Sequence, residues 1–195
     1  MATKLGIVNS ALLKLGARTI SSLNDSSKTA RLANETFDGI RDLVLQSHEW
    51  NFAMKRESVA SDVTGPEWGF DFAYSVPIDC FKVISINGED LNSCKWKVEG
   101  RKIVTDLTSP VEILFIFRAE DYGDYPPLFS DALAERCAAE WCQRVTGTDS
   151  TQQIHVNLSN RKINEAKSVD GQEGTPKKIG AGAWIESRWG GRPGF

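Results

Sequence analysis

Histidines, the commonest residues of acid–base and metal chemistry, are few in this 195-residue chain. Its only histidines are His48 and His155, and neither belongs to a metal-ligand spacing such as HExxH. Two histidines cannot build a histidine-rich zinc centre, so we expect no metal site. His48 lies in the stretch SHEWNF, near the expected end of a helix, where a cation interacts favourably with the helix dipole. We therefore predict a structural role for His48.

One loop, RAEDYGDYPP, brings three carboxylates together in the sequence: Glu120, Asp121 and Asp124. Enzymes that hydrolyse sugar bonds use a pair of carboxylates as acid and base or nucleophile. The loop is bounded by prolines, and acids on such surface loops are commonly just solvated. We therefore predict no catalytic residue and keep a hydrolase as the enzyme alternative.

Other catalytic and cofactor motifs are missing. No GxSxG elbow, Walker loop or GxGxxG after a strand occurs, so serine hydrolases and nucleotide-binding proteins have no motif in their favour. The spacing of Cys80, Cys94, Cys137 and Cys142 fits neither a CxxC redox pair nor a zinc site. We expect buried thiols in a reducing compartment, and no cofactor.

The end of the chain, KKIGAGAWIESRWGGRPGF, is its most unusual stretch. Residues 175–195 hold four basic residues and one acid, a net charge of +3 in a chain whose total is -3. Glycines keep such a segment flexible, and exposed aromatic side chains are a liability unless they have a partner. Tryptophan and arginine are enriched among binding hot spots. We predict an arm that docks on a neighbouring subunit or another protein, with folding back onto its own helices as the alternative. The docking residues are Trp184, Ile185, Arg188, Trp189, Arg192 and Phe195.

The overall composition, with 41% hydrophobic and 25% charged residues, is that of an ordinary globular protein. The net charge of -3 argues against a dedicated nucleic-acid binder, which would be distinctly basic. No stretch approaches the roughly 20 apolar residues of a membrane helix, and the start does not resemble a signal peptide. We expect a protein made in the cytosol, with no membrane partner.

The first half of the chain predicts two helices. Apolar residues recur at helical spacing over residues 4–16, and Gly16 can end this helix in the left-handed conformation. A Ser- and Asp-rich turn then favours a second helix from Ser26 or Ser27 to about Trp50. Its apolar face consists of Ala30, Ala33, Phe37, Ile40 and Val44.

The middle of the chain predicts antiparallel strands. FKVISINGED places Asn87-Gly88 at a tight hairpin turn, and KWKVEGRKIVTD repeats this pattern around Glu99-Gly100. The run from Val111 to Phe117 is apolar enough for a central strand buried on both faces. Together these segments predict a small antiparallel sheet.

Two more helices are expected after the strands. The third begins at Pro127 and ends at Gly147. Its buried stripe comprises Leu128, Ala132, Leu133, Cys137, Ala138, Trp141 and Val145. The fourth, over residues 149–170, is more polar, so we expect it to be largely exposed or to face a wet interface. Its thin apolar seam comprises Ile154, Leu158, Ile163 and Ala166.

The predicted fold class is therefore α+β: a four-helix bundle with an inserted antiparallel β-domain and an extended C-terminal arm. Residues 1–50 and 126–172 form the discontinuous helical bundle. Residues 51–125 form the inserted β-domain, and residues 173–195 form the arm.

Several stretches, in this order, resemble the tail tubular protein A or head-tail adaptor family of short-tailed bacteriophages. IVNSALLKLGARTISSL is similar to its N-terminal signature, and RDLVLQSHEWNFAMKRE to its second helix. FRAEDYGDYPPLFSDALAERCAAEW is similar to its third block. Together the matches cover most of residues 5–170. The matching positions are Trp50, Asn51, Phe52, Arg118, Asp121, Tyr122 and Pro126.

The resemblance implies a non-enzymatic virion component. Members of this family form a ring, typically of twelve copies, below the portal protein, and DNA passes through its channel without specific binding. A distal tail nozzle, similar to tail tubular protein B, and tail fibres attach below. The arm is the least similar part, so its docking on the portal is our inference from its residues. We expect it to be mobile in the free subunit and to become ordered on contact.

Two other functions remain as alternatives. A tail-associated cell-wall hydrolase would use the carboxylates near Glu120 and Asp121. A DNA-contacting channel module would use the helix at residues 149–170 or the basic arm, and its affinity would fall steeply with salt.

Overall fold

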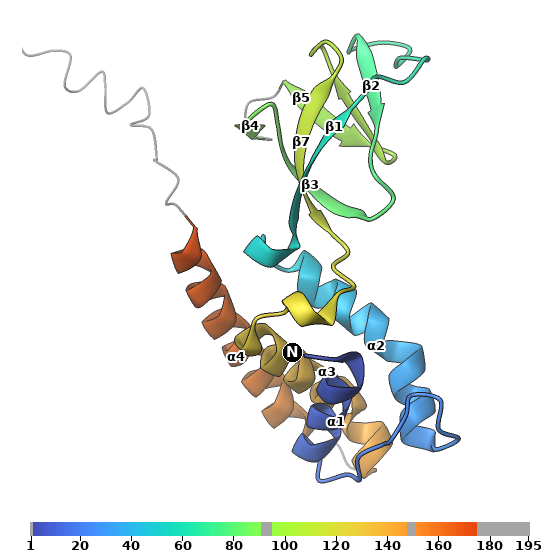
Figure 1. Cartoon of the computed structure of the whole chain (residues 1–195), viewed down its shortest axis with the longest axis vertical. Coiled ribbons are helices and arrows are strands. Elements are labelled where there is room, and N and C mark those ends of the chain that lie inside the picture. The colour runs from blue at the N-terminus through green and yellow to red at the C-terminus, as the bar shows by residue number, and fades with distance from the viewer. Residues whose placement is uncertain (1, 91–94, 148–150, 175–195) are drawn as a thin grey trace, which may run out of the picture.

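The computed structural model describes residues 2–90, 95–147 and 151–174, and has the mixed α+β character expected from the sequence. In Figure 1 the helices occupy one end of the molecule and the strands the other. All strands lie between α2 and α3 in the chain. The helices are α1 (Lys4–Lys14), α2 (Lys28–Gln46), α3 (Pro127–Thr146) and α4 (Gln152–Glu173).

Most helix ends follow their local capping residues. The Ser27 hydroxyl accepts a hydrogen bond from the Ala30 N–H at 3.1 Å, so α2 begins where the sequence predicts. Gly16 and Gly147 have φ of 68° and 73°, the left-handed conformation that ends α1 and α3. The predicted end of α2 near Trp50 is wrong, because the helix stops at Gln46.

The early end of α2 has a tertiary cause. The Trp50 indole N–H donates to the Val44 carbonyl at 3.0 Å, and the Ser47 hydroxyl donates to the same oxygen at 2.8 Å. In a longer helix the Val44 carbonyl would accept a backbone hydrogen bond, and these two side-chain bonds replace it. They also hold Trp50 in the core. A short 3-10 helix, η1 (Asn51–Ala53), follows and leads into the first strand.

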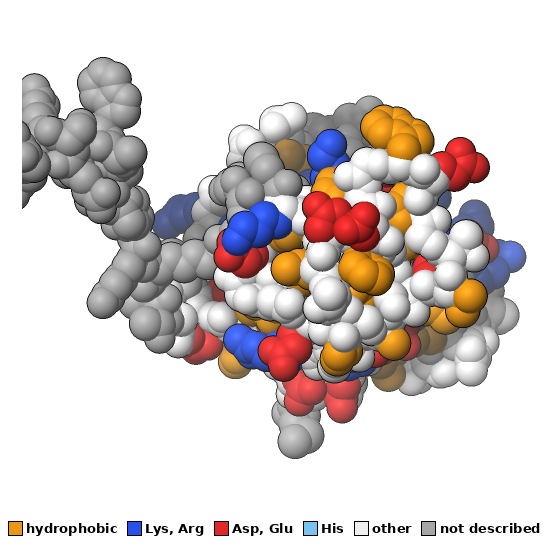
Figure 2. All heavy atoms as spheres, turned by 90° about the horizontal axis from the view of Figure 1, so that it is seen from above, with side chains coloured by type: hydrophobic (Ala, Val, Ile, Leu, Met, Phe, Trp, Pro, Cys, Tyr) orange, Lys and Arg blue, Asp and Glu red, His pale blue; other side chains and the backbone are white. Residues whose placement is uncertain are grey.

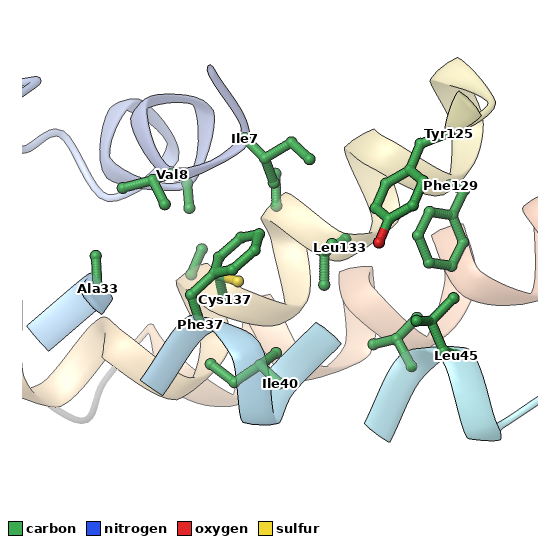
Figure 3. Close-up of a cluster of buried hydrophobic side chains, with 14 of the residues drawn as sticks. Ile7, Val8, Ala33, Phe37, Ile40, Leu45, Tyr125, Phe129, Leu133 and Cys137 are labelled. Atoms are coloured by element: carbon green, nitrogen blue, oxygen red, sulfur yellow. The ribbon is translucent and has the colours of Figure 1, made fainter. Parts of the chain in front are cut away.

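The four helices share one hydrophobic core around α3, which contacts α1, α2 and α4. Figure 3 shows Ile7 and Val8 of α1 and Phe37 of α2 directed toward Leu133 and Cys137 of α3. The predicted apolar face of α2 is buried throughout. The predicted stripe of α3 is buried except at two positions: Val145 is half-buried, and Leu128, in its first turn, is exposed.

The apolar seam predicted for α4 is wrong in its first half. Ile154 is 56% exposed and Leu158 37%, whereas Ile163 is half-buried and Ala166 is buried. The face that α4 turns inward also carries Ser159 and Asp170, both buried. Most of the helix surface is exposed, as its polarity predicts.

The strands form two antiparallel sheets. The larger contains β1 (Met54–Val59), β7 (Val111–Phe117), β3 (Cys80–Ile86) and β4 (Glu89–Asp90), in the order β1-β7-β3-β4. The smaller has the order β2-β6-β5, with β2 (Phe72–Ser75), β6 (Lys102–Thr105) and β5 (Trp96–Glu99). The two predicted hairpins therefore lie in different sheets.

The hairpin turns differ in one detail from the prediction. Asn87 and Gly88 have φ of 47° and 81°, so they form the β3–β4 turn as expected. The second turn falls one residue later, at Gly100 and Arg101, with φ of 54° and 64°. A left-handed arginine costs about 1–2 kcal/mol. The Arg101 guanidinium donates to the Pro77 carbonyl at 2.7 Å, which helps to hold this turn.

Strand β7 is central, as predicted, but is covered on both faces only near its end. Phe115 packs into a second hydrophobic cluster inside the β part, while Ile116 on the opposite face belongs to the helical core. Glu112, nearer the strand's start, is exposed. Phe117 packs against both clusters, so the end of β7 joins the two halves of the molecule.

Candidate functional site

The six residues predicted to dock the arm lie outside the described residues. The structure describes the chain as far as Gly174, one residue beyond α4. The candidate site is therefore built from the described surfaces and from the junction of the two halves. The predicted residues outside the described part are Trp184, Ile185, Arg188, Trp189, Arg192 and Phe195.

A buried arginine holds the end of the β part against α2. Arg41 has only 4% of its side chain exposed, and its guanidinium lies 2.8 Å from Asp42 and 3.3 Å from Asp38. It also donates to the Tyr122 hydroxyl at 3.1 Å. Burial alone would lower the pKa of Arg41, but Asp42 and Tyr122 raise it above its ordinary value. The arginine therefore stays charged and fixed in place.

A second arginine completes this junction. Arg118, just after β7, lies 2.9 Å from the second carboxylate oxygen of Asp42 and covers the Phe81 ring at 5.4 Å. Lys4 of α1 pairs with Asp38 at 2.9 Å. We call the ion pairs of Lys4, Asp38, Arg41, Asp42 and Arg118 the waist network. It ties α1, α2 and the exit of β7 together.

Aromatic rings pack beside the waist network. Phe129 of α3 lies 4.9 Å from Trp50, 4.8 Å from Phe52 and 4.9 Å from Tyr125, measured between ring centroids. The Tyr125 hydroxyl donates to the Ala119 carbonyl at 2.6 Å. The stretches around Trp50 and around Tyr122 are thus brought to one place by the fold.

Two of the three carboxylates of the loop after β7 have structural partners. The Asp121 carboxylate accepts a hydrogen bond from the Gly123 N–H at 2.8 Å and caps the 3-10 helix η3 (Tyr122–Asp124). Glu120 is exposed and lies 3.8 Å from the Arg41 guanidinium. Asp121 therefore acts as a helix cap, and Glu120 as an exposed ion-pair partner of Arg41.

The described cysteines are buried thiols, as predicted: Cys80, Cys137 and Cys142, while Cys94 lies outside the described residues. Burial raises the pKa of Cys80 to about 11, and burial also raises the pKa of Cys137. A thiol with such a pKa is a poor nucleophile at neutral pH. The described residues contain no group of three or more His, Cys, Asp or Glu placed to hold a metal.

Within the part of the chain that the structure describes, none of the helices combines the length and apolarity needed to cross a membrane.

Both histidines pair with carboxylates. His48 lies two residues past the end of α2, and its Nε2 is 3.2 Å from the Asp170 carboxylate of α4. The contact gives His48 a structural role, because it joins the end of α2 to α4. The helix-dipole argument did not predict Asp170 as its partner. His155 Nδ1 is 2.7 Å from Glu135.

Glu135 is the centre of a second polar cluster, which we call the Glu135 network. This α3 carboxylate is 4% exposed and lies 3.3 Å from Lys14 of α1 and 3.1 Å from Lys162 of α4. Asp131 pairs with the same two lysines at 2.8 and 2.7 Å. Burial alone would raise the pKa of Glu135, but hydrogen bonds from His155 and the lysines hold it below its ordinary value.

A mostly apolar groove lies between the start of α3 and the end of α4. Its volume is about 130 Å³, with Leu128 and Val169 on its walls and Glu173, the last residue of α4, at its rim. The buried rings of Trp50 and Phe129 also line it. We call this feature the α3–α4 groove. It lies beside the point where residues 175–195 leave the described part of the chain.

The β end of the molecule also exposes large apolar side chains. The loop between β1 and β2 carries Trp68, which is 86% exposed, and Val63, which is fully exposed. Figure 2 looks onto this end and shows apolar side chains lying among acidic ones. The sequence reasoning missed Trp68, although a tryptophan between Glu67 and Gly69 in a glycine- and proline-containing loop was a usable signal.

Comparisons with known proteins add no assignment: no family model matches the chain, and no curated protein is significantly similar to it.

Proposed function

We propose that the chain is a structural head-tail adaptor subunit of a short-tailed bacteriophage particle, with no enzymatic activity. The resemblance of residues 5–170 to that family motivates the proposal. The observation that carries it is the exposure of apolar side chains on two separate surfaces of the molecule. Trp68 is exposed at the far end of the β part, and Leu128 and Val169 line the α3–α4 groove beside the junction of helices and strands.

An assembly subunit needs two such surfaces. A closed ring is built from heterologous contacts, and a ring placed between two other rings must also bind above and below. Exposed apolar patches commonly mark protein–protein contacts or ligand-binding grooves. The described clusters of charged residues, the waist and Glu135 networks, fix helices to one another. We therefore assign the charged groups to stability and the apolar ones to assembly.

The form of the proposed particle follows from the resemblance to the adaptor family. The helices form a four-helix bundle with the β part as an inserted domain, and about twelve subunits form the ring. The arm docks on the portal protein, and a distal nozzle or tail fibres attach at the opposite side. Residues 51–125 hold thirteen acidic and eight basic residues, a net charge of -5. Such a surface repels phosphates, which suits a channel through which DNA passes.

The direct test is native mass spectrometry of the full chain with portal rings of the same phage. We expect stoichiometric binding by the full chain and loss of binding by a chain ending at Pro176. Binding that survives this truncation would remove the docking role of the arm. No binding by either chain would contradict the adaptor function itself.

A further inference from the structure

We propose that the α3–α4 groove is the docking site for a tryptophan of the chain's own C-terminal segment, residues 175–195, within the same molecule. The proposal does not rest on the adaptor function. It concerns which surface holds this segment while the subunit is free, and four observations support it.

The groove is preformed. The Trp50 indole that lines it is fixed by a hydrogen bond to the Val44 carbonyl at 3.0 Å. Asp170, also in the lining, accepts a hydrogen bond from the Asn51 N–H at 3.0 Å. Leu128 and Val169 are 38% and 40% exposed there, so apolar surface faces water on both walls. A rigid apolar groove gains most from an apolar occupant that needs no rearrangement.

The volume of the groove is suited to a single aromatic ring. A volume of about 130 Å³ is close to the roughly 150 Å³ cavity that holds a benzene molecule. The six-membered ring of an indole therefore fits, while its N–H can remain at the rim. Residues 175–195 contain two tryptophans, Trp184 and Trp189, which supply such a ring.

The covalent connection favours the chain's own segment over a second copy. Glu173 stands at the rim of the groove, and Trp184 follows it by only eleven residues. A flexible chain of that length has a root-mean-square span of about 18 Å, which allows a return to the rim. Short flexible tethers give effective concentrations in the millimolar range, above what a second copy would reach in dilute solution.

Charge at the rim complements the segment. The exposed Glu173 carboxylate has no hydrogen bond or ion pair to any residue that the structure describes. The segment carries a net charge of +3, with Lys177 and Lys178 only four and five residues beyond Glu173. The carboxylate can accept a hydrogen bond from an indole N–H or pair with either lysine.

Docking in the groove changes one expectation from the sequence, namely that the C-terminal arm is mobile along its whole length in the free subunit. A tryptophan seated in the groove is not available to another protein, so binding of the arm elsewhere must first release it. Any affinity for a partner is then reduced by the fraction of molecules in which the groove is occupied.

Fluorine NMR of the full chain labelled with 5-fluorotryptophan tests this directly. Trp184→Phe and Trp189→Phe assign the two resonances, while the signals of buried Trp96 and Trp141 report on folding. We expect at least one segment resonance to be shifted from its unfolded position and protected from solvent. Val169→Glu should return it to the unfolded position, because the charge enters the wall of the groove.

Ile154→Glu is the matched control, since Ile154 is an exposed aliphatic residue of the same helix and does not line the groove. It should leave the segment resonances unchanged. Two unfolded-type segment resonances in the unmodified chain would overturn the proposal. Protection that survives Val169→Glu would also overturn it. Protection that increases with protein concentration would show that a second copy fills the groove and would overturn docking within one molecule.

Discussion

Asn51 and Asp170 lie 119 residues apart in sequence, yet two hydrogen bonds join them. The Asn51 backbone N–H donates to the Asp170 carboxylate at 3.0 Å, and the Asn51 side-chain amide donates to the Asp170 carbonyl at 2.6 Å. His48 contacts the other carboxylate oxygen at 3.2 Å. This contact anchors α4 to the segment where the chain passes from helices to strands.

Replacing Asp170 tests the anchor. We expect Asp170→Ala to lower the free energy of unfolding by about 1–3 kcal/mol, because the Asn51 N–H loses its partner in a part-buried place. Urea unfolding followed by circular dichroism measures the change. Glu165→Ala, at an exposed position of the same helix, should change stability by less than about 0.5 kcal/mol. Equal effects of the two variants would contradict the anchor.

The Glu135 network predicts a loss of stability in acid. For Glu135 and Asp131, burial alone would raise the pKa, but hydrogen bonds from lysines, and from His155 to Glu135, hold both values below the ordinary range. A lowered carboxylate pKa contributes stability above the unfolded value, roughly pH 4, and that stability is lost as the pH falls through the folded value.

The measurement is the free energy of unfolding between pH 7 and pH 2, for the native chain and for Glu135→Gln. The variant should be less stable at pH 7 and should lose less stability on acidification. Parallel curves for the two proteins would argue against this role of Glu135.

Arg41 should be far more important for stability than an exposed arginine. Arg41→Ala removes a buried guanidinium and its bonds to Asp42, Asp38 and Tyr122, while Asp42 keeps Arg118 and Asp38 keeps Lys4. We therefore expect a loss of about 1–3 kcal/mol. Arg136 pairs with Glu140 at 2.7 Å within α3, and 30% of its side chain is exposed. Arg136→Ala should cost less than about 0.5 kcal/mol. Thermal and urea unfolding of both variants would show whether this ranking is right.

Trp68 should affect assembly without affecting folding. Because this side chain is 86% exposed, Trp68→Ala should leave the free energy of unfolding within about 0.5 kcal/mol of the native value. If the β end is an assembly surface, the same change should weaken ring formation or distal binding by tenfold or more. Leu13→Ala, at a 64% exposed position on α1, serves as the control. Normal assembly of the Trp68→Ala variant would show that the β end is not an assembly surface.

The hydrolase alternative makes a separate prediction. We expect no clearing in a zymogram on purified cell wall, since Asp121 caps η3 and Glu120 pairs with Arg41 at 3.8 Å. Activity that disappears in both Glu120→Gln and Asp121→Asn would establish the enzyme instead. Activity unaffected by either substitution would indicate a contaminant.

Signals that act over a few residues were predictable from the sequence. Ser27 starts α2, Gly147 ends α3, and Asn87-Gly88 makes the β3–β4 turn. Each depends on a local cap or on a backbone conformation that few residue types adopt. The α+β class follows from them, because helical and strand periods occupy separate stretches of the chain. The docking residues predicted for the arm lie outside the described residues, so they remain a prediction.

Positions set by distant partners were not predictable. The period of apolar residues suggested Ile154 and Leu158 as the inner face of α4, but the helix turns Lys162 and Asp170 inward instead. That choice is favourable only because Glu135, on another helix, and Asn51, at the start of the strands, satisfy these polar groups.

The sequence by itself determined where most elements begin and turn, since capping residues and positive φ act within a few residues. Only the tertiary structure decided that α2 stops at Gln46, that α4 turns a polar face inward, and that a groove opens beside Glu173. These features depend on hydrogen bonds, ion pairs and packing between residues far apart in the chain. A local pattern cannot specify such contacts, because the free energy that makes them favourable comes from the partner.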